Sequence, residues 1–274
     1  MDERMEAVRK TIRSAGEFLI DRFGKEIRGG IEEKKANDFV TEVDRGSERI
    51  ITGALLESFP EIGLFAEEGG VTGSAERFWI IDPLDGTTNF IHGYPVFAVS
   101  IALYEKGGTT LGAVYDPTRD ELFEAVRGGG AFCNGEPIRV SNAALLSESL
   151  LGTGFPFSVP RHIDAYLGAF RELFLRCRGM RRAGSAALDL CHVAAGRLDG
   201  FWELYLKPWD MAAGALIVEE AGGAVDDFFG GGDYLSAGHI VAATRALLPS
   251  IVEVTRARFS PSDVESLSSR LPGS

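Results

Sequence analysis

Amphipathic helices and short apolar strands alternate along this 274-residue chain, and that order excludes all-α and all-β folds. Apolar residues recur at helical spacing through residues 3–23, where the pattern predicts a helix; they are Met5, Val8, Ile12, Ala15 and Leu19. Short runs rich in β-branched and aromatic residues follow and are typical of strands. The expected fold class is therefore α/β (α+β), with sheets layered between helices.

The predicted elements continue to the end of the chain. Strands are expected at residues 62–66, 78–81, 96–104, 150–153, 198–203 and 240–243, and a hairpin at 110–115 and 122–126. Helices are expected at 45–58, 161–177, 185–195, 211–221 and 244–257, with a short one opened by Ser260-Pro261. No repeat or linker interrupts this order, so one domain is predicted over residues 1–274. Its approximate lobes are 1–145 and 146–274.

Composition excludes several classes of function. Subtracting 40 acidic from 28 basic side chains leaves a net charge of −12, which argues against nucleic acid and anionic membranes as partners. No apolar run is long enough to span a bilayer. The three cysteines have no disulfide-framework spacing, which indicates a reducing, cytoplasmic setting.

Carboxylates at the ends of predicted strands are the most informative side chains. Glu67 follows the strand at 62–66, and Asp82 and Asp85 follow the strand at 78–81. Asp210 opens an apolar helix, where it fits a helix N-cap. Asp82 and Asp85 also fit a proline-containing turn in which both acids cap backbone amides.

Two carboxylates in one tight turn repel each other, and a divalent cation removes that repulsion. Because no histidine or cysteine lies nearby, the hard oxygen ligands favour Mg²⁺ or Mn²⁺ over zinc. Gly86, Thr87 and Thr88 come directly after the acids, and a helix beginning there would offer free amides to an anion. Carboxylates for metals beside amides for an anion are what phosphate-ester hydrolysis needs.

Other catalytic motifs are absent or fit poorly. The sequence contains no Walker A motif and no His-Glu-x-x-His. The spacing of Asp82 and Asp85 differs by one residue from the Asp-x-Asp of haloacid-dehalogenase phosphatases. The glycines at 128–130 are predicted to form a turn and not a phosphate cradle.

Five segments occur together in one order, and together they resemble the bacterial branch of the inositol monophosphatase family. The resemblance extends over about residues 5–258. The segments are Asp38-Phe-Val-Thr-Glu-Val-Asp44, Ala66-Glu67-Glu68, Trp79 to Phe90, Trp209-Asp210-Met-Ala-Ala-Gly214 and Glu220-Ala-Gly-Gly223.

The resemblance implies a layered α/β/α/β/α sandwich that forms a homodimer and hydrolyses phosphate monoesters. It implies two to three Mg²⁺ ions, with Mn²⁺ as a substitute, and inhibition by lithium. The metal ligands carried over are Glu67, Asp82, the Leu84 carbonyl, Asp85 and Asp210.

The same resemblance assigns the remaining site residues. Asp44 and Thr87 match the pair that helps Glu67 to orient the attacking water, and the reaction is direct attack without a covalent enzyme intermediate. The substrate-binding residues carried over are Asp85, Gly86, Thr87, Arg181, Gly184, Ser185, Ala186, Glu203 and Asp210. Many family members have a lysine before the Asp38 motif, whereas strict counting here gives Glu33, so Lys34 or Lys35 is left for that role.

Inositol 1-phosphate is the expected substrate, but related groups use the same scaffold for others. These are fructose 1,6-bisphosphate, histidinol phosphate, adenosine 3′,5′-bisphosphate and NADP. Arg181, Arg182 and Lys207 are the cations available for a second phosphate. Some bacterial relatives act instead as interaction proteins in transcription complexes, with catalysis dispensable, and this remains the alternative from another class.

Overall fold

Two β-sheets organise the chain, whose computed structural model describes residues 3–25, 31–35, 38–155, 160–264 and 271–272. Among these residues the larger sheet has eight strands in the order β10-β9-β8-β7-β6-β5-β3-β4. Its strands are β3 Gly63–Ala66, β4 Gly70–Thr72, β5 Arg77–Asp85, β6 Ala98–Glu105, β7 Gly108–Asp116, β8 Glu121–Val126, β9 Ala131–Cys133 and β10 Glu136–Pro137.

The smaller sheet has the order β12-β11-β13-β15-β14 over the described residues. Its strands are β11 Leu150–Thr153, β12 Gly179–Arg181, β13 Gly200–Leu204, β14 Ala224–Asp226 and β15 His239–Ala243. A separate antiparallel pair is formed by β1 Ile31–Lys35 and β2 Asp38–Thr41. The helices are α1 Glu3–Ile20, α2 Glu42–Ser58, α3 Thr87–Ile91, α4 Ile163–Arg176, α5 Ala186–Ala194, α6 Pro208–Glu220, α7 Tyr234–Ala237, α8 Leu248–Arg258 and α9 Pro261–Val264, with 3₁₀ turns at Leu146–Glu148 and Pro160–His162.

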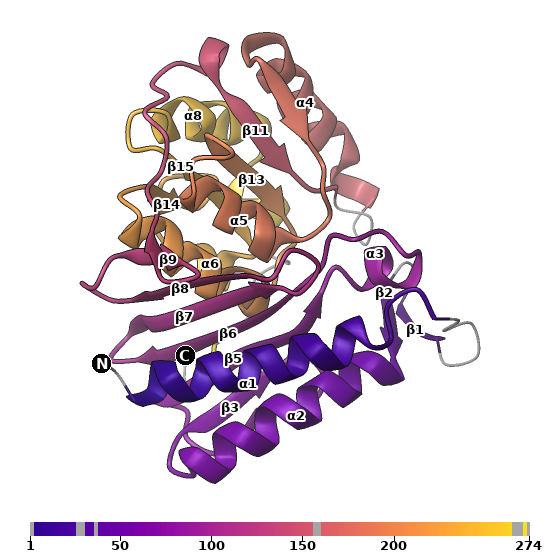
Figure 1. Cartoon of the computed structure of the whole chain (residues 1–274). Coiled ribbons are helices and arrows are strands. Elements are labelled where there is room, and N and C mark those ends of the chain that lie inside the picture. Colours follow the sequence, from indigo (N-terminus) through magenta and orange to yellow (C-terminus); the bar gives the residue numbers. More distant parts are fainter. Residues whose placement is uncertain (1–2, 26–30, 36–37, 156–159, 265–270, 273–274) are drawn as a thin grey trace.

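Helices and sheets stack in five layers (Figure 1). The first layer is α1 and α2, which pack on the outer face of the larger sheet, and α5 and α6 fill the space between the two sheets. The outer face of the smaller sheet is covered by α4 and α8. The predicted α/β/α/β/α sandwich is therefore confirmed.

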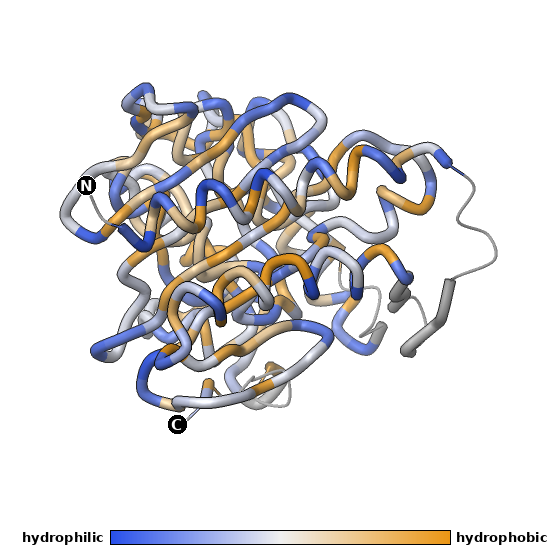
Figure 2. The backbone as a smooth tube through the Cα atoms, turned by 60° about the horizontal axis from the view of Figure 1, so that its bottom comes forward, coloured by the Kyte–Doolittle hydropathy of each residue, from blue (hydrophilic) through white to orange (hydrophobic). Residues whose placement is uncertain are grey.

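Alternating side chains on β5 explain how the larger sheet separates two cores. Phe78 and Ile80 face α5 and α6, whereas Trp79 and Ile81 face α1 and α2. Both faces are buried, so the strand is an almost continuous apolar run, as its sequence indicated. In Figure 2, hydrophobic segments of the backbone run through the middle of the molecule, and hydrophilic segments lie at many of its outer turns.

The parallel pairing of β3 with β5 positions the acidic residues. Ala66, the last residue of β3, pairs with Ile81, so Glu67 and Asp82 leave the pairing at the same edge. The strand predicted at 78–81 is longer than expected, because β5 continues to Asp85 with an irregular register between Asp82 and Asp85. These two acids therefore lie within β5 and not after it.

Most predicted helices and strands are confirmed, with shifted ends. The predicted hairpin is formed by β7 and β8, and the glycines at 128–130 form the expected turn. In that turn the amides of Gly128 and Gly130 donate to the Glu220 carboxylate at 2.8 and 2.9 Å, which leaves them no role with phosphate. Strands β4, β9, β10, β12 and β14 were not predicted, because two or three residues are too few to show a period.

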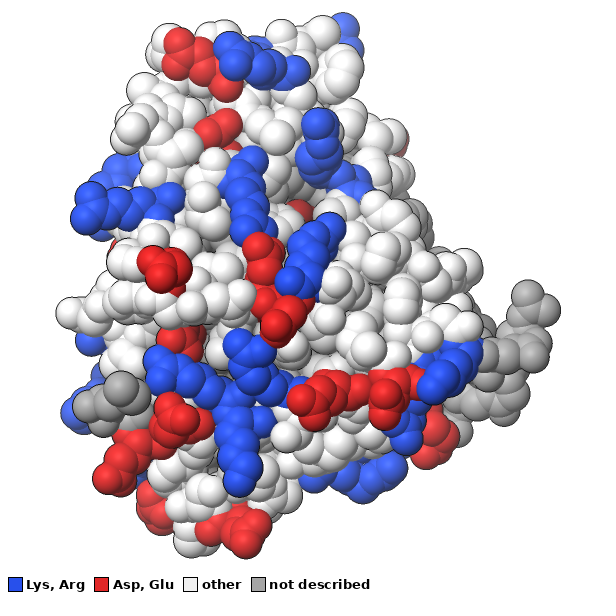
Figure 3. Space-filling view, in the orientation of Figure 1, with Lys and Arg blue, Asp and Glu red and all other residues white. Residues whose placement is uncertain are grey.

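The charged surface, the helix hydropathy and the thiols are the features on which the expectations from composition depend. On the face shown in Figure 3, acidic and basic side chains are interspersed. In the part of the chain that the structure describes, no helix has the length and hydropathy required to cross a bilayer. Cys133, Cys177 and Cys191 are free thiols. The cytoplasmic location stays a prediction.

Candidate metal and phosphate site

Three carboxylates from two distant segments meet at the end of β5. Asp82, Asp85 and Asp210 each place one oxygen within 4.8 Å of the others. Asp82 and Asp85 are buried, with 2% and 9% of their surfaces exposed. Asp210 is the third residue of α6 and not its N-cap, because its carboxylate accepts the amide of Lys207 at 2.6 Å. Its negative charge is therefore fixed at the helix N-terminus, beside the two acids of β5.

The crowding of these acids shifts their pKa values upward. Burial raises the pKa of Asp210 to about 7, and the charge of Asp85 adds to the shift. Burial also raises the pKa of Asp85 to about 6, although bonds from Ser185 and two backbone amides oppose the change. Burial and the charges of Glu67, Asp85 and Asp210 raise the pKa of Asp82 well above its ordinary value. Such a cluster favours protons or a cation between its oxygens.

Glu67 belongs to the same electrostatic group. It is half-buried, and its charge is the strongest of the neighbouring charges that raise the pKa of Asp82. Its amide donates to the Ile81 carbonyl at 3.2 Å, which ties the end of β3 to β5. The three aspartates offer hard oxygen ligands of the kind that fits Mg²⁺ or Mn²⁺, and the charge of Glu67 acts on this group.

A hydroxyl and a further buried acid lie beside this cluster. The Thr87 hydroxyl is 3.1 Å from both the Asp44 carboxylate and the Leu84 carbonyl, either of which accepts its proton. Asp44 belongs to α2 and is 1% exposed. The predicted pairing of Thr87 with Asp44 is thus present in the structure.

Glycine is required where the turn after Asp85 meets the second lobe. Gly86 has φ of 96°, and a Cβ there would lie 2.9 Å from the Val96 carbonyl oxygen. Gly184 has φ of 93° and lies against the same turn, since its carbonyl oxygen is 3.3 Å from that Cβ position. The helix predicted after Gly86 is α3, which begins at Thr87.

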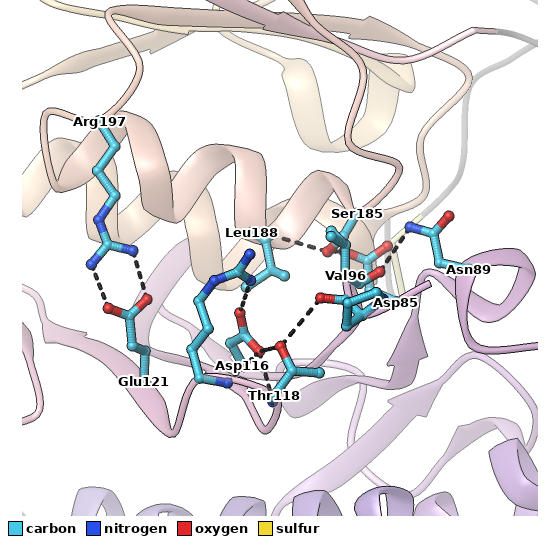
Figure 4. Close-up of polar contacts among 11 residues, drawn as sticks. Asp85, Asn89, Val96, Asp116, Thr118, Glu121, Ser185, Leu188 and Arg197 are labelled. Atoms are coloured by element: carbon cyan, nitrogen blue, oxygen red, sulfur yellow. Dashed lines mark hydrogen bonds and ion pairs between the residues drawn. The ribbon is translucent and has the colours of Figure 1, made fainter. Parts of the chain in front are cut away.

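Ser185 and Asn89 join the two halves of the site. The Ser185 hydroxyl and the Ala187 amide donate to Asp85 Oδ2 at 2.6 and 2.8 Å. The Asn89 side-chain nitrogen lies 2.8 Å from the Val96 carbonyl oxygen and 3.0 Å from that of Ala183. In Figure 4 Ser185 stands directly above Asp85, and the Asn89 amide points toward Val96. The end of β5 is therefore joined to the N-terminus of α5, between the two sheets.

A second acidic group lies next to the first. Burial raises the pKa of Glu203 well above its ordinary value, and the charge of Asp189 adds to the shift. The positive charge of Arg182 opposes the upward pKa shifts of Asp85, Asp189 and Glu203. Glu203 also packs on the backbone of Gly154, where no Cβ would fit.

The structure thus brings together most of the site residues predicted from the sequence. Arg181 differs, because its exposed guanidinium donates to the Met180 carbonyl at 3.0 Å, whereas the charge of the neighbouring Arg182 acts on the acids. The side chains of Lys34 and Lys35 lie outside the described residues. Asn89 and Asp189 were missed, although Asn89 lies within the motif from Trp79 to Phe90. Arg182 was considered only as a cation for a second phosphate.

Comparisons with known proteins agree with this geometry. The family model described as the inositol monophosphatase family matches residues 1–258, so the chain belongs to that family. It is 48% identical over 259 residues to "Nus factor SuhB" of Pseudomonas aeruginosa, covering 92% of this chain and 96% of the relative.

Two solved structures are similar over almost their whole length. The first, an extragenic suppressor protein suhB from Bartonella henselae, has a TM-score of 0.88 and 41% identity, covering 92% of this chain and 98% of the other. The second is an IMPase from Thermotoga maritima with a TM-score of 0.86 and 37% identity, covering 98% and 100%. The fold and the phosphatase family are thereby established.

Proposed function

We propose that this protein is a Mg²⁺-dependent phosphate monoester hydrolase whose substrate is inositol 1-phosphate. The observation that carries the proposal is the convergence of Asp82, Asp85 and Asp210 within 4.8 Å, beside the pair formed by Thr87 and Asp44. Glu67, the three aspartates and the Leu84 carbonyl are the groups that would hold two to three ions. Bound Mg²⁺ would neutralise phosphate charge, lower the pKa of a water molecule and stabilise the leaving oxygen.

Thr87, Asp44 and Glu67 are proposed to orient the attacking water. When Thr87 donates a hydrogen bond to Asp44, its oxygen keeps lone pairs that can accept a hydrogen bond from water. Asp44 is buried beside that hydroxyl, so the donor direction of Thr87 is fixed before substrate arrives. Glu67 approaches from the end of β3 and accepts a hydrogen bond from the other hydrogen of the water. Attack is direct, without a covalent enzyme intermediate.

The other proposed contacts divide between phosphate and alcohol. Gly86 and Thr87 offer backbone amides to the phosphate, since Gly86 carries no side chain and α3 begins at Thr87. Gly184, Ser185 and Ala186 line the neighbouring wall, and Glu203 accepts from hydroxyl groups of the alcohol. Arg182 replaces Arg181 in this proposal because its charge acts on Glu203.

Charge favours a polyol monoester over a bisphosphate. The region that would take the alcohol contains Glu203, and the charge of the buried Asp189 adds to the upward shift of its pKa. A second phosphate would bring further negative charge to a place where the raised pKa values show that negative charge is already disfavoured. Hydroxyl groups instead donate to carboxylates, and their binding leaves no charge unpaired.

Phosphate release from a panel of esters tests the function. The purified protein should release phosphate from inositol 1-phosphate only with Mg²⁺ or Mn²⁺, and lithium should inhibit the reaction. Fructose 1,6-bisphosphate, adenosine 3′,5′-bisphosphate, NADP and histidinol phosphate should react more slowly. A faster reaction with one of these esters would support the proposed chemistry but assign a different substrate. If no ester released phosphate, the proposal that the protein is a hydrolase would be refuted.

A homodimer is proposed on the outer face of α4. Ile163, Leu167 and Phe174 lie on one face of this helix and are 36%, 46% and 56% exposed. A two-fold contact between copies would bury this stripe on both protomers. Light scattering should give the mass of a dimer for the wild type and of a monomer for Leu167→Glu. A Leu167→Glu dimer would place the interface elsewhere.

A role in transcription complexes is the second candidate, and the Nus factor name of the Pseudomonas aeruginosa relative favours it. In that role the acidic site would be dispensable and a protein-binding surface would matter. Both functions are compatible with a cytoplasmic location, which we also propose.

A further inference from the structure

One face of α2 reaches three separate segments of the site. Asp44, Ser47 and Glu48 lie three and four residues apart, so they share a face of the helix. Their exposed fractions are 1%, 0% and 8%. Asp44 accepts from Thr87, and the Ser47 hydroxyl donates to the Pro83 carbonyl at 2.8 Å. The third contact is made by Glu48, to which the proposed chemistry assigns no role.

Glu48 holds the turn that carries Glu67. The backbone amide of Glu68 donates to Glu48 Oε2 at 2.8 Å. The preceding amide, that of Glu67, donates to the Ile81 carbonyl at 3.2 Å. Two consecutive amides are thus fixed on different elements, α2 and β5. The backbone on both sides of the Glu67 side chain is therefore held in place.

Gly69 shows that the second oxygen of Glu48 also lies close to this turn. A Cβ at position 69 would lie 2.9 Å from Glu48 Oε1, closer than real Cβ atoms stand. Because glycine has no Cβ, the turn can lie close to Oε1 of Glu48 while the Glu68 amide bonds to Oε2. Each oxygen of Glu48 therefore packs against the turn of residues 67–69, one by a hydrogen bond and one by close contact.

We propose that Glu48 is a positioning residue, which fixes the turn of residues 67–69 and so holds Glu67 in place at the end of β3. The inference rests on the proposed function for the metal-binding role of Glu67. The proposed function assigns Glu48 no contact with substrate or metal. Residues that contact a metal ligand without binding the metal are important for the site. Their mutation lowers metal affinity or activity by roughly 10–100-fold.

Two substitutions separate the hydrogen bond from the charge. Glu48→Gln keeps a side-chain oxygen that accepts the Glu68 amide, whereas Glu48→Ala removes the acceptor. Glu124→Ala is the matched control, since Glu124 is another buried carboxylate, 4% exposed, but is paired with Arg9 on the α1 side of β8. The control reports what the loss of a buried acid does to the protein as a whole.

The first measurement is Mn²⁺ affinity by calorimetry. Glu48→Ala should bind Mn²⁺ about 10–100-fold more weakly, while Glu48→Gln should stay within about threefold of the wild type. Glu124→Ala should bind as the wild type does. Equal weakening by Ala and Gln would overturn the proposal, because the charge and not the amide bond would then matter. Unchanged affinity in Glu48→Ala would overturn it as well.

The second measurement needs neither metal nor substrate. Hydrogen exchange at the Glu68 amide should be at least about tenfold faster in Glu48→Ala than in the wild type, because the amide loses its acceptor. In Glu48→Gln and Glu124→Ala it should keep its wild-type rate. If the wild type bound no Mn²⁺, the proposed function would fail, and exchange would still decide whether Glu48 fixes the turn. Equal exchange in Glu48→Ala and the wild type would refute that.

Discussion

Asp85→Asn should reduce the rate of phosphate release by at least about a hundredfold while leaving the protein folded. The amide has the shape of the carboxylate, and its oxygen still accepts from Ser185 or Ala187. What is lost is one negative charge from a cluster of three. Mutation of a residue that only contacts a metal ligand lowers activity by roughly 10–100-fold. Loss of a direct ligand should therefore lower the rate further.

Steady-state kinetics with inositol 1-phosphate measure this effect, and thermal unfolding checks the fold. Asp120→Asn is the matched control, because this exposed aspartate is bound to Arg13 and Tyr115 far along the chain from the acidic cluster. It should keep the wild-type rate. A wild-type rate in Asp85→Asn would remove Asp85 from the proposed site.

The same variant separates hydrolysis from a role in transcription. If RNA polymerase components are retained equally by the wild type and by Asp85→Asn, the chain has a binding function that does not depend on the acidic site. If neither form retains them, hydrolysis stands as the function. Loss of retention in Asp85→Asn alone would link binding to the site itself.

The sequence predicted the layers well because the hydrophobic periods are long and regular. Apolar residues at helical spacing from Met5 to Leu19 predicted α1, and the apolar run before Asp82 predicted the start of β5. Strand ends were harder to place. The continuation of β5 to Asp85 depends on pairing with β6, which reaches Asp85 through Ala98, and no local pattern contains that information.

The site was predictable for residues within contiguous motifs and not for residues that act across the fold. Asp82, Asp85 and Asp210 stood out as acids in apolar surroundings. Arg181 and Arg182 are adjacent and chemically identical, so only the path of the chain after β12 shows which of them faces Glu203. Glu48 looks like one more acid on an amphipathic helix until the structure shows its bond to Glu68.

The three aspartates also make the stability of the metal-free protein depend on pH. Folding raises the pKa of Asp85 to about 6 and that of Asp210 to about 7, from an ordinary value of 3.8, and raises that of Asp82 as well. Between about pH 4 and pH 7 the folded protein therefore binds more protons than the unfolded chain. The free energy of unfolding must fall as pH rises through this window, because the slope follows the difference in bound protons.

Mg²⁺ should therefore stabilise the protein strongly at about pH 8 and little at about pH 5. Each unit of pKa shift corresponds to about 1.4 kcal/mol, so the metal-free protein should lose on the order of a few kcal/mol across the window. For a chain of this size that corresponds to roughly 10 °C in Tm. Thermal unfolding with Mg²⁺ and with a chelator, at both pH values, measures the effect. Asp85→Asn should show a smaller fall with pH, since one of the titrating groups is gone. An equal Mg²⁺ effect at both pH values would show that the cation binds away from these aspartates.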